Sequence, residues 1–285
     1  MNKIILYTWV FVLTMTSCNS ENKKSRGTSS INHMTLTEFT EKFEGVWLPE
    51  LYVNEIRKSK SAYLSRNSIP EISELTIHRR NLKNDTLFVG SSLNNHEGFG
   101  FTIWDSGQQE NSSFSNNIFD WSKEKKYQFT YDLTKKSISI IRKNMEGKID
   151  NQIDYIKVLE PEYVSNFGGV GYEIISREVT LNGKYQILDS LKKDLGVINF
   201  EPKSGKIQNF EFSHYSITTD FIGPQYPSDY ILLRLEQNKR KNQKYLSLIN
   251  SNDSIILYDN KEIMTDSTYE IGLNEINYYL TKINY

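Results

Sequence analysis

The sequence predicts an all-β fold, in which an antiparallel meander of strands forms one or two barrels after short N-terminal helices. From Glu71 onward, apolar residues recur with a period of two in short runs, and turn-forming residues separate most of these runs. The chain also holds 18 Tyr and 14 Phe, residue types that favour strands. No long helical pattern alternates with the runs, which disfavours a parallel α/β fold.

Residues 1–17 have the layout of a secretory signal. Lys3 precedes an apolar run over residues 4–13, which is shorter than the about 20 residues that a membrane-spanning helix needs. Thr16 and Ser17 supply the small side chains that cleavage requires, and Cys18 supplies a thiol for acylation. We therefore expect a lipoprotein signal peptide over residues 1–17 and lipidation at Cys18. An ordinary secretory signal followed by an accidental cysteine is the alternative.

Acylation with two or more chains, such as palmitate, anchors a protein stably. The sequence thus predicts a lipoprotein of the cell outer membrane, facing the periplasm or the cell surface. Cys18 is the only cysteine, so no disulfide forms within one chain. Residues 18–34 are mostly polar and predict a lipidated cysteine followed by a disordered tether.

The 34 basic and 35 acidic residues give a net charge of −1, and they form no basic field for nucleic acid. The length allows one large domain or two small ones. We expect a first meander with the N-terminal helices over residues 35–165 and a second meander over residues 166–285.

Two short helices open the folded part. Thr35 and Glu38 fit a capping box that starts a helix ending at Gly45. Pro49 suits the first turn of a second helix, on which apolar residues recur at helical spacing as far as Tyr63. Strands are predicted over residues 74–78, 86–91, 99–105, 127–132, 137–142, 152–158, 184–188, 196–200, 206–213, 216–220, 229–235, 245–250 and 254–259.

The sequence Gly45-Val46-Trp47 before a strand series resembles the start of the lipocalin or calycin superfamily, whose first barrel strand carries Gly-x-Trp. A second start, Gly183-Lys184-Tyr185, precedes the later strands and hints at a duplication. Residues 183–257 and 85–101 are similar to lipocalin-like parts of uncharacterised bacterial lipoproteins. In that likeness the strand over residues 253–257 closes the barrel. The resemblance implies a barrel fold and a small apolar ligand.

The sequence departs from the lipocalin pattern in two ways, and both argue against assigning a small apolar ligand to this chain. A lipocalin barrel needs about 150 to 180 residues, so the longer mature chain favours two packed meanders. The family's Thr-Asp-Tyr motif has only near matches, at residues 219–221 and 228–230, and neither stands at the usual distance from Gly45.

Recognisable catalytic and cofactor motifs are missing from the sequence. The four His include no His-x-x-x-His pair, so we predict no metal site. The chain has no Gly-x-Ser-x-Gly elbow and no phosphate-binding Gly-x-x-x-x-Gly-Lys loop. We predict no cofactor and expect the protein not to be an enzyme.

The densest polar cluster is Asn94, Asn95, His96 and Glu97, between two apolar strands. One interpretation is a ligand-contacting rim of amides, imidazole and carboxylate at a barrel mouth beside Trp104. The other is a hairpin turn in which Asn and Gly supply positive φ.

A second cluster combines His214 and Tyr215 with Asp220, which could transfer protons or act as a turn residue before a Gly-Pro loop. Tyr226, between two prolines, could line a carbohydrate-stacking face. Trp47, Trp104 and Trp121 are expected to be buried or half-buried.

Three functions fit these features. The first is a non-catalytic, lipid-anchored binding module for a small apolar ligand, a glycan or an envelope protein. The second is a hydrolase of envelope or external polymers, for which Glu97 and Asp220 are the carboxylates to test. The third is a protective or immunity lipoprotein that binds a protein partner. A cavity of about 300 Å³ or more inside the barrel favours a small ligand, whereas a filled interior with an exposed aromatic patch favours a protein partner.

Overall fold

The structure is a computed structural model that describes residues 34–106, 112–118, 125–163, 170–222, 226–236, 243–251, 254–264 and 269–283. The predicted signal peptide, Cys18 and Trp121 lie outside the described residues, as does the predicted tether up to residue 33. Met34, the last residue of the predicted tether, is buried in the core of the first barrel. No helix in the described part of the chain has the length and apolar character needed to cross a membrane.

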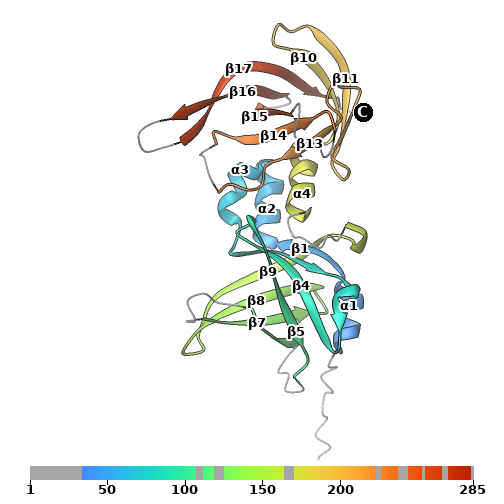
Figure 1. Cartoon of the computed structure of the whole chain (residues 1–285), viewed down its shortest axis with the longest axis vertical. Helices are drawn as coiled ribbons and strands as arrows, with labels where there is room; N and C mark the ends of the chain where they lie inside the picture. Colours follow the sequence, from blue (N-terminus) through green and yellow to red (C-terminus); the bar gives the residue numbers. More distant parts are fainter. Residues whose placement is uncertain are drawn as a thin grey trace, which may run out of the picture. The chain divides into compact units, whose positions relative to one another are not determined.

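The predicted fold class is confirmed, because the strands form two closed antiparallel barrels of eight strands each (Figure 1). The first barrel has the strand order β2-β1-β9-β8-β7-β6-β5-β4 and is closed by pairing of β2 with β4, while the short β3 pairs with β4 outside this ring. Its strands are β1 (Gly45–Pro49), β2 (Ile72–Ile77), β3 (Leu82–Lys83), β4 (Thr86–Leu93), β5 (Glu97–Trp104), β6 (Ser113–Asn116), β7 (Lys125–Asp132), β8 (Ser137–Asn144) and β9 (Ile149–Leu159).

The second barrel is a simple meander in which each strand pairs with the next and β17 returns to pair with β10. Its strands are β10 (Gly183–Asp189), β11 (Asp194–Glu201), β12 (Lys206–Gln208), β13 (His214–Ile217), β14 (Asp229–Arg234), β15 (Gln243–Ser251), β16 (Ser254–Met264) and β17 (Tyr269–Lys282).

Two predictions about this barrel are wrong. The strand predicted over residues 206–213 ends at Gln208, because the chain turns there through Asn209 with a positive φ of 60°. The barrel is closed by β17 rather than by the segment predicted over residues 253–257, of which residues 254–257 belong to the preceding strand, β16. The sequence analysis predicts no strand over β17. Its pairing with β16 contains two register shifts, and such irregularities disturb the alternation of inward and outward side chains.

The first helix, α1 (Leu36–Phe43), confirms the predicted capping box. The Thr35 hydroxyl accepts a hydrogen bond from the Glu38 amide, and the Glu38 carboxylate accepts one from the Thr35 amide at 2.9 Å. Phe39 and Phe43 of this helix are buried in the core of the first barrel. The helix therefore closes over that core by its aromatic face.

The second predicted helix is interrupted. α2 (Glu50–Ser59) ends at Lys60, whose φ of 58° is left-handed, and Ser61 then caps the short α3 (Ala62–Ser65), so Tyr63 lies on a separate helix. Pro49 is the N-cap and also the last residue of β1. The 3₁₀ turns are η1 (Arg66–Ser68), η2 (Arg79–Asn81) and η3 (Pro161–Tyr163).

A fourth helix, α4 (Val170–Thr180), lies between the predicted strands over residues 152–158 and 184–188, where the sequence analysis predicts no element. Its buried residues lie on several sides and include the polar Ser176, Arg177 and Thr180 beside the apolar Tyr172 and Ile175. Tyr52 of α2 and Tyr172 of α4 share one hydrophobic cluster with the interior of the second barrel. The Tyr172 hydroxyl donates to the Ser73 carbonyl of β2 at 2.8 Å, which ties the same helix to the first barrel.

Candidate functional site

The interior positions of both barrels are occupied by large buried side chains. In the first barrel these include Trp47, Phe101, Phe129 and Tyr155. In the second they include Tyr185, Phe200, Tyr215 and Leu280. Ligand contacts are therefore better sought on the outer surfaces. Trp47 is 1% exposed, which confirms its predicted burial.

The polar cluster between β4 and β5 is a tight turn. Asn94 and Asn95 have φ values of 50° and 54°, and the His96 amide donates to the Leu93 carbonyl at 2.9 Å. The predicted hairpin turn is thus present, with asparagine in the left-handed conformation that it tolerates better than most residues.

The same turn also contacts the second barrel. The Asn95 side-chain amide donates to the Thr219 carbonyl at 2.8 Å, and His96 Nδ1 lies 2.7 Å from Asp220 Oδ2. Two clusters that the sequence suggests separately, around residues 94–97 and around Asp220, therefore meet. We call this contact the His96–Asp220 bridge.

Asp220 also acts as the predicted turn residue, because its Oδ1 accepts a hydrogen bond from the Ile222 amide at 3.0 Å. Both of its carboxylate oxygens are therefore engaged. His214, predicted beside it, instead has its Nδ1 within 2.8 Å of the Ser213 hydroxyl, and the buried Tyr215 donates to the Leu181 carbonyl. These contacts give His214 and Tyr215 a structural role in the second barrel.

Trp104 does not lie beside the turn, and that part of the prediction is wrong. Glu97 is the first residue of β5 and Trp104 is the last, so the length of the strand separates them. Trp104 is half-buried, as expected, and with Ser113 and Tyr127 it lines a separate hollow of about 370 Å³. Glu97 is exposed at the turn.

Tyr226 belongs to a cluster of tyrosines on the second barrel. Its ring lies 4.9 Å from that of Tyr230, and the Tyr230 ring lies 5.6 Å from that of Tyr245 with an interplanar angle of 23°. Tyr269 joins the cluster from β17, since its hydroxyl interacts electrostatically with those of Tyr226 and Tyr230. Tyr226, Tyr230, Tyr245 and Tyr269 form what we call the tyrosine face.

Hydrogen bonds of the hydroxyl groups restrict three of the four rings of the tyrosine face. Tyr245 donates to Gln243 at 2.9 Å, Tyr230 hydrogen-bonds with Asn260, and Tyr269 hydrogen-bonds with Glu262. Burial and the neighbouring tyrosines raise the pKa of Tyr230 to about 12. Tyr245 and Tyr269 nevertheless remain 46% and 41% exposed. The face thus combines fixed geometry with accessible aromatic surface.

The tyrosine face adjoins the His96–Asp220 bridge. Burial raises the pKa of Tyr226, and the nearby carboxylate of Asp220 raises it further. Four of the predicted candidates, Asn95, His96, Asp220 and Tyr226, therefore gather in one region. Sequence analysis misses the other three tyrosines of the face, although two of them lie on predicted strands, because which strands are neighbours is set only by the fold.

The β16–β17 hairpin, which carries Tyr269, projects beyond the rest of the second barrel (Figure 1). Among the described residues, residues 260–264 of β16 pair only with residues 269–273 of β17. Met264 lies opposite Tyr269 in this register and is exposed. The hairpin therefore presents apolar surface and unpaired strand edges together.

The sequence and the structure match no family model, no curated protein and no solved structure. In the part of the chain that the structure describes, no three His, Cys, Asp or Glu residues gather as metal ligands would.

Proposed function

We propose that the protein is a lipid-anchored, non-catalytic module of the cell envelope that binds a protein partner through the tyrosine face. The anchor rests on the sequence of residues 1–18. The choice of a protein partner rests on one observation: large buried side chains occupy interior positions of both barrels, while a cluster of tyrosine rings lies at the surface.

Tyrosine is enriched at protein interfaces because it offers a large rigid contact area at low entropic cost. Hydrogen bonds to Gln243, Asn260 and Glu262 already restrict the rings, so less conformational freedom is lost on binding. The carboxylates of Asp220 and Glu262 border the face and favour a partner surface that carries basic groups.

Chemical cross-linking in cells, followed by purification of the lipoprotein, tests this proposal. The tested variant is the double substitution Tyr245→Ala and Tyr269→Ala. The control is Leu191→Ala, which removes an apolar side chain that is 86% exposed on the β10–β11 turn. We expect the wild type and the control to retain a cross-linked protein that the double variant loses. Equal recovery from all three proteins would refute the assignment of the face.

The anchor is tested separately by fractionation. The wild type should sediment with membranes, and the Cys18→Ala variant should not. A protective lipoprotein that binds a toxin is one form of this proposal, since its partner is also a protein.

A hydrolase is the second candidate, because a carboxylate within hydrogen-bond distance of His96 Nδ1 can orient the ring as a general base. Both side chains are exposed, however, and Asp220 is also held in its turn. If this candidate holds, His96→Ala should abolish turnover of an envelope polymer while the tyrosine variants retain it.

A further inference from the structure

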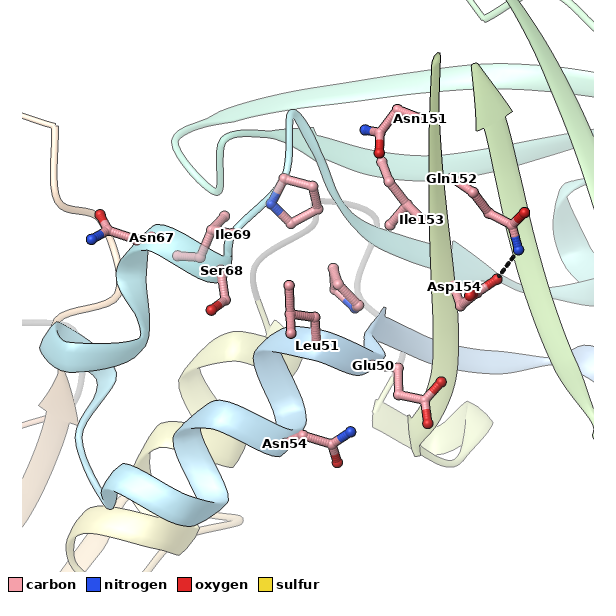
Figure 2. Close-up of a pocket in the computed structure, with 12 residues that line it drawn as sticks. Glu50, Leu51, Asn54, Asn67, Ser68, Ile69, Asn151, Gln152, Ile153 and Asp154 are labelled. Carbon is pink, nitrogen blue, oxygen red and sulfur yellow. Dashed lines mark hydrogen bonds between the residues drawn. The ribbon is translucent and has the colours of Figure 1, made fainter. Parts of the chain in front are cut away.

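The outer surface of the first barrel carries a groove on both sides of β9. One part, of about 480 Å³, lies between the start of α2, residues 67–70 and residues 151–154 of β9 (Figure 2). The other part, of about 790 Å³, runs over the outward faces of β7, β8 and β9. Both parts share Glu50, Gln152 and Asp154, so we treat them as one site, the β9 groove.

The floor of the β9 groove follows from strand alternation. On β7 and β8, Phe129 and Ile140 point into the core, so Thr130 and Ser139 point outward. The register places Thr130 opposite Ser139, and Ser139 opposite Asp154. A row of hydroxyl and carboxylate groups thus crosses the three strands.

Hydrogen bonds fix part of this row and leave the rest available. Asp154 Oδ1 accepts from the Ser139 hydroxyl at 2.6 Å and from the Gln152 side-chain amide at 2.8 Å (Figure 2). Within the described ranges, the carboxylate of Glu50 and the side-chain amides of Asn54 and Gln128 form no hydrogen bond. The groove therefore holds both pre-oriented groups and groups ready to bind a ligand.

The chemistry of the lining restricts the ligand. Amides, hydroxyls and carboxylates dominate, and Lys135 is the only cationic side chain among the described residues that line the groove. Carboxylates at Glu50 and Asp154 disfavour anionic ligands such as phosphates or acidic glycans. Leu51 and Ile69 add apolar contacts in the smaller part (Figure 2). Hydrogen-bonding groups beside apolar patches suit a ligand with many hydroxyls and exposed C–H faces.

An extended peptide fits less well. Peptides often bind by adding a strand to a free sheet edge, where the backbone supplies the hydrogen bonds. The larger part of the groove lacks such an edge, because β8 pairs with both β7 and β9 along it. Among the described residues, residues 149–154 of β9 pair only with β8, so the smaller part of the groove borders a free strand edge. In the larger part, recognition must therefore come from side chains.

We infer that the β9 groove binds a neutral or amino-sugar oligosaccharide. Each part of the groove has the size of ordinary ligand sites, about 300 to 1,000 Å³. This site is independent of the tyrosine face, so the protein would carry a glycan and a partner protein on different surfaces.

The test applies the full-length protein, extracted in detergent, to immobilised cello-oligosaccharides, chito-oligosaccharides and oligogalacturonates. The groove variant is Gln152→Ala with Asp154→Ala, and Glu50→Gln is a second, milder variant. The matched control is Gln186→Ala with Asp194→Ala, which removes a similar hydrogen-bonded Gln–Asp pair from the exposed faces of β10 and β11.

We expect retention on a neutral or amino-sugar oligomer, with affinity reduced about tenfold or more in the groove variant and reduced less in Glu50→Gln. The control and the double tyrosine variant should bind like the wild type. Retention of no neutral or amino-sugar oligomer, preference for the oligogalacturonates, or equal binding by the groove variant and the wild type would each overturn the inference.

Discussion

His96 Nδ1 lies 2.7 Å from Asp220 Oδ2, although 124 positions of the sequence separate the two residues. This contact, with the adjacent bond from Asn95 to the Thr219 carbonyl, joins the β4–β5 turn of the first barrel to the segment after β13 of the second. It also brings together two regions that the sequence suggests only as separate candidates.

The bridge should contribute little to stability, because both side chains are well exposed to water. A double-mutant cycle of His96→Ala and Asp220→Ala, measured by denaturant unfolding, should give a coupling free energy of about 0.2–1 kcal/mol. The coupling should shrink in 1 M salt, because the Debye length falls to about 3 Å at that concentration. A coupling of zero at low salt would mean that the contact does not form in solution.

Gly45 should tolerate no side chain. Its φ is 138°, and a Cβ atom there would lie 2.5 Å from the Leu159 carbonyl oxygen. Gly45→Ala should therefore lower the free energy of unfolding by about 1–3 kcal/mol. Gly98→Ala is the control, because a Cβ at that strand position meets nothing within 4 Å. Equal stability of the two variants would show that β1 does not approach β9 as described.

Glu44 should make the first barrel sensitive to acid. Burial raises the pKa of its carboxyl, but hydrogen bonds from Arg79 and the charges of Arg79 and His78 outweigh burial and lower it below the ordinary 4.5. The unfolded state thus binds the proton more tightly, so the stabilisation is present above about pH 4.5 and is lost as the pH falls through the lowered pKa.

Glu44→Gln should cost about 1–3 kcal/mol at pH 7 and should reduce the loss of stability in acid. Thermal unfolding measured between pH 3 and pH 7 checks both effects. Glu41→Gln, on the exposed side of α1, is the control and should leave the pH profile unchanged. An unchanged acid profile in Glu44→Gln would contradict the assignment.

Asp229 should have the opposite pH dependence. Burial raises the pKa of its carboxyl above the ordinary 3.8, although the Tyr63 amide, the Ser61 hydroxyl and the Ala62 amide donate hydrogen bonds that lower it. The folded state therefore holds the proton more tightly, and this contribution to stability declines as the pH rises through the raised pKa.

Asp229→Asn should remove the decline in the free energy of unfolding as the pH rises through the raised pKa of Asp229. Asp229→Ala should lower the free energy of unfolding by about 1–3 kcal/mol, because buried donors at the start of α3 lose their acceptor. Unfolding of both variants as a function of pH provides the measurement. Asp85→Asn, in an exposed turn, serves as the control. A profile for Asp229→Asn that matches the wild type would argue against a buried, titrating carboxyl.

Most strands could be predicted because one face of each is buried, which leaves a period of two in the sequence. β7, β10 and β11 follow this rule closely. β3 and β6 have two and four residues, too few to show any period. α4 was not predicted, although its residues Tyr172, Ile175 and Val179 recur at helical spacing.

The candidate site could be predicted only in pieces. Asn95, His96, Asp220 and Tyr226 stand out as polar or aromatic residues near turns, which local sequence reveals. Their convergence depends on which strands neighbour one another and on contacts between the barrels, which local patterns do not encode. The β9 groove was missed for the same reason, because its lining comes from five separate segments.

The proposed location of the protein is tested most directly by intact-mass spectrometry of the native protein isolated from cells. We predict an amino terminus at Cys18 that carries two or three acyl chains. An amino terminus at Met1, or an unmodified thiol at Cys18, would contradict the membrane anchor and the envelope function that depends on it.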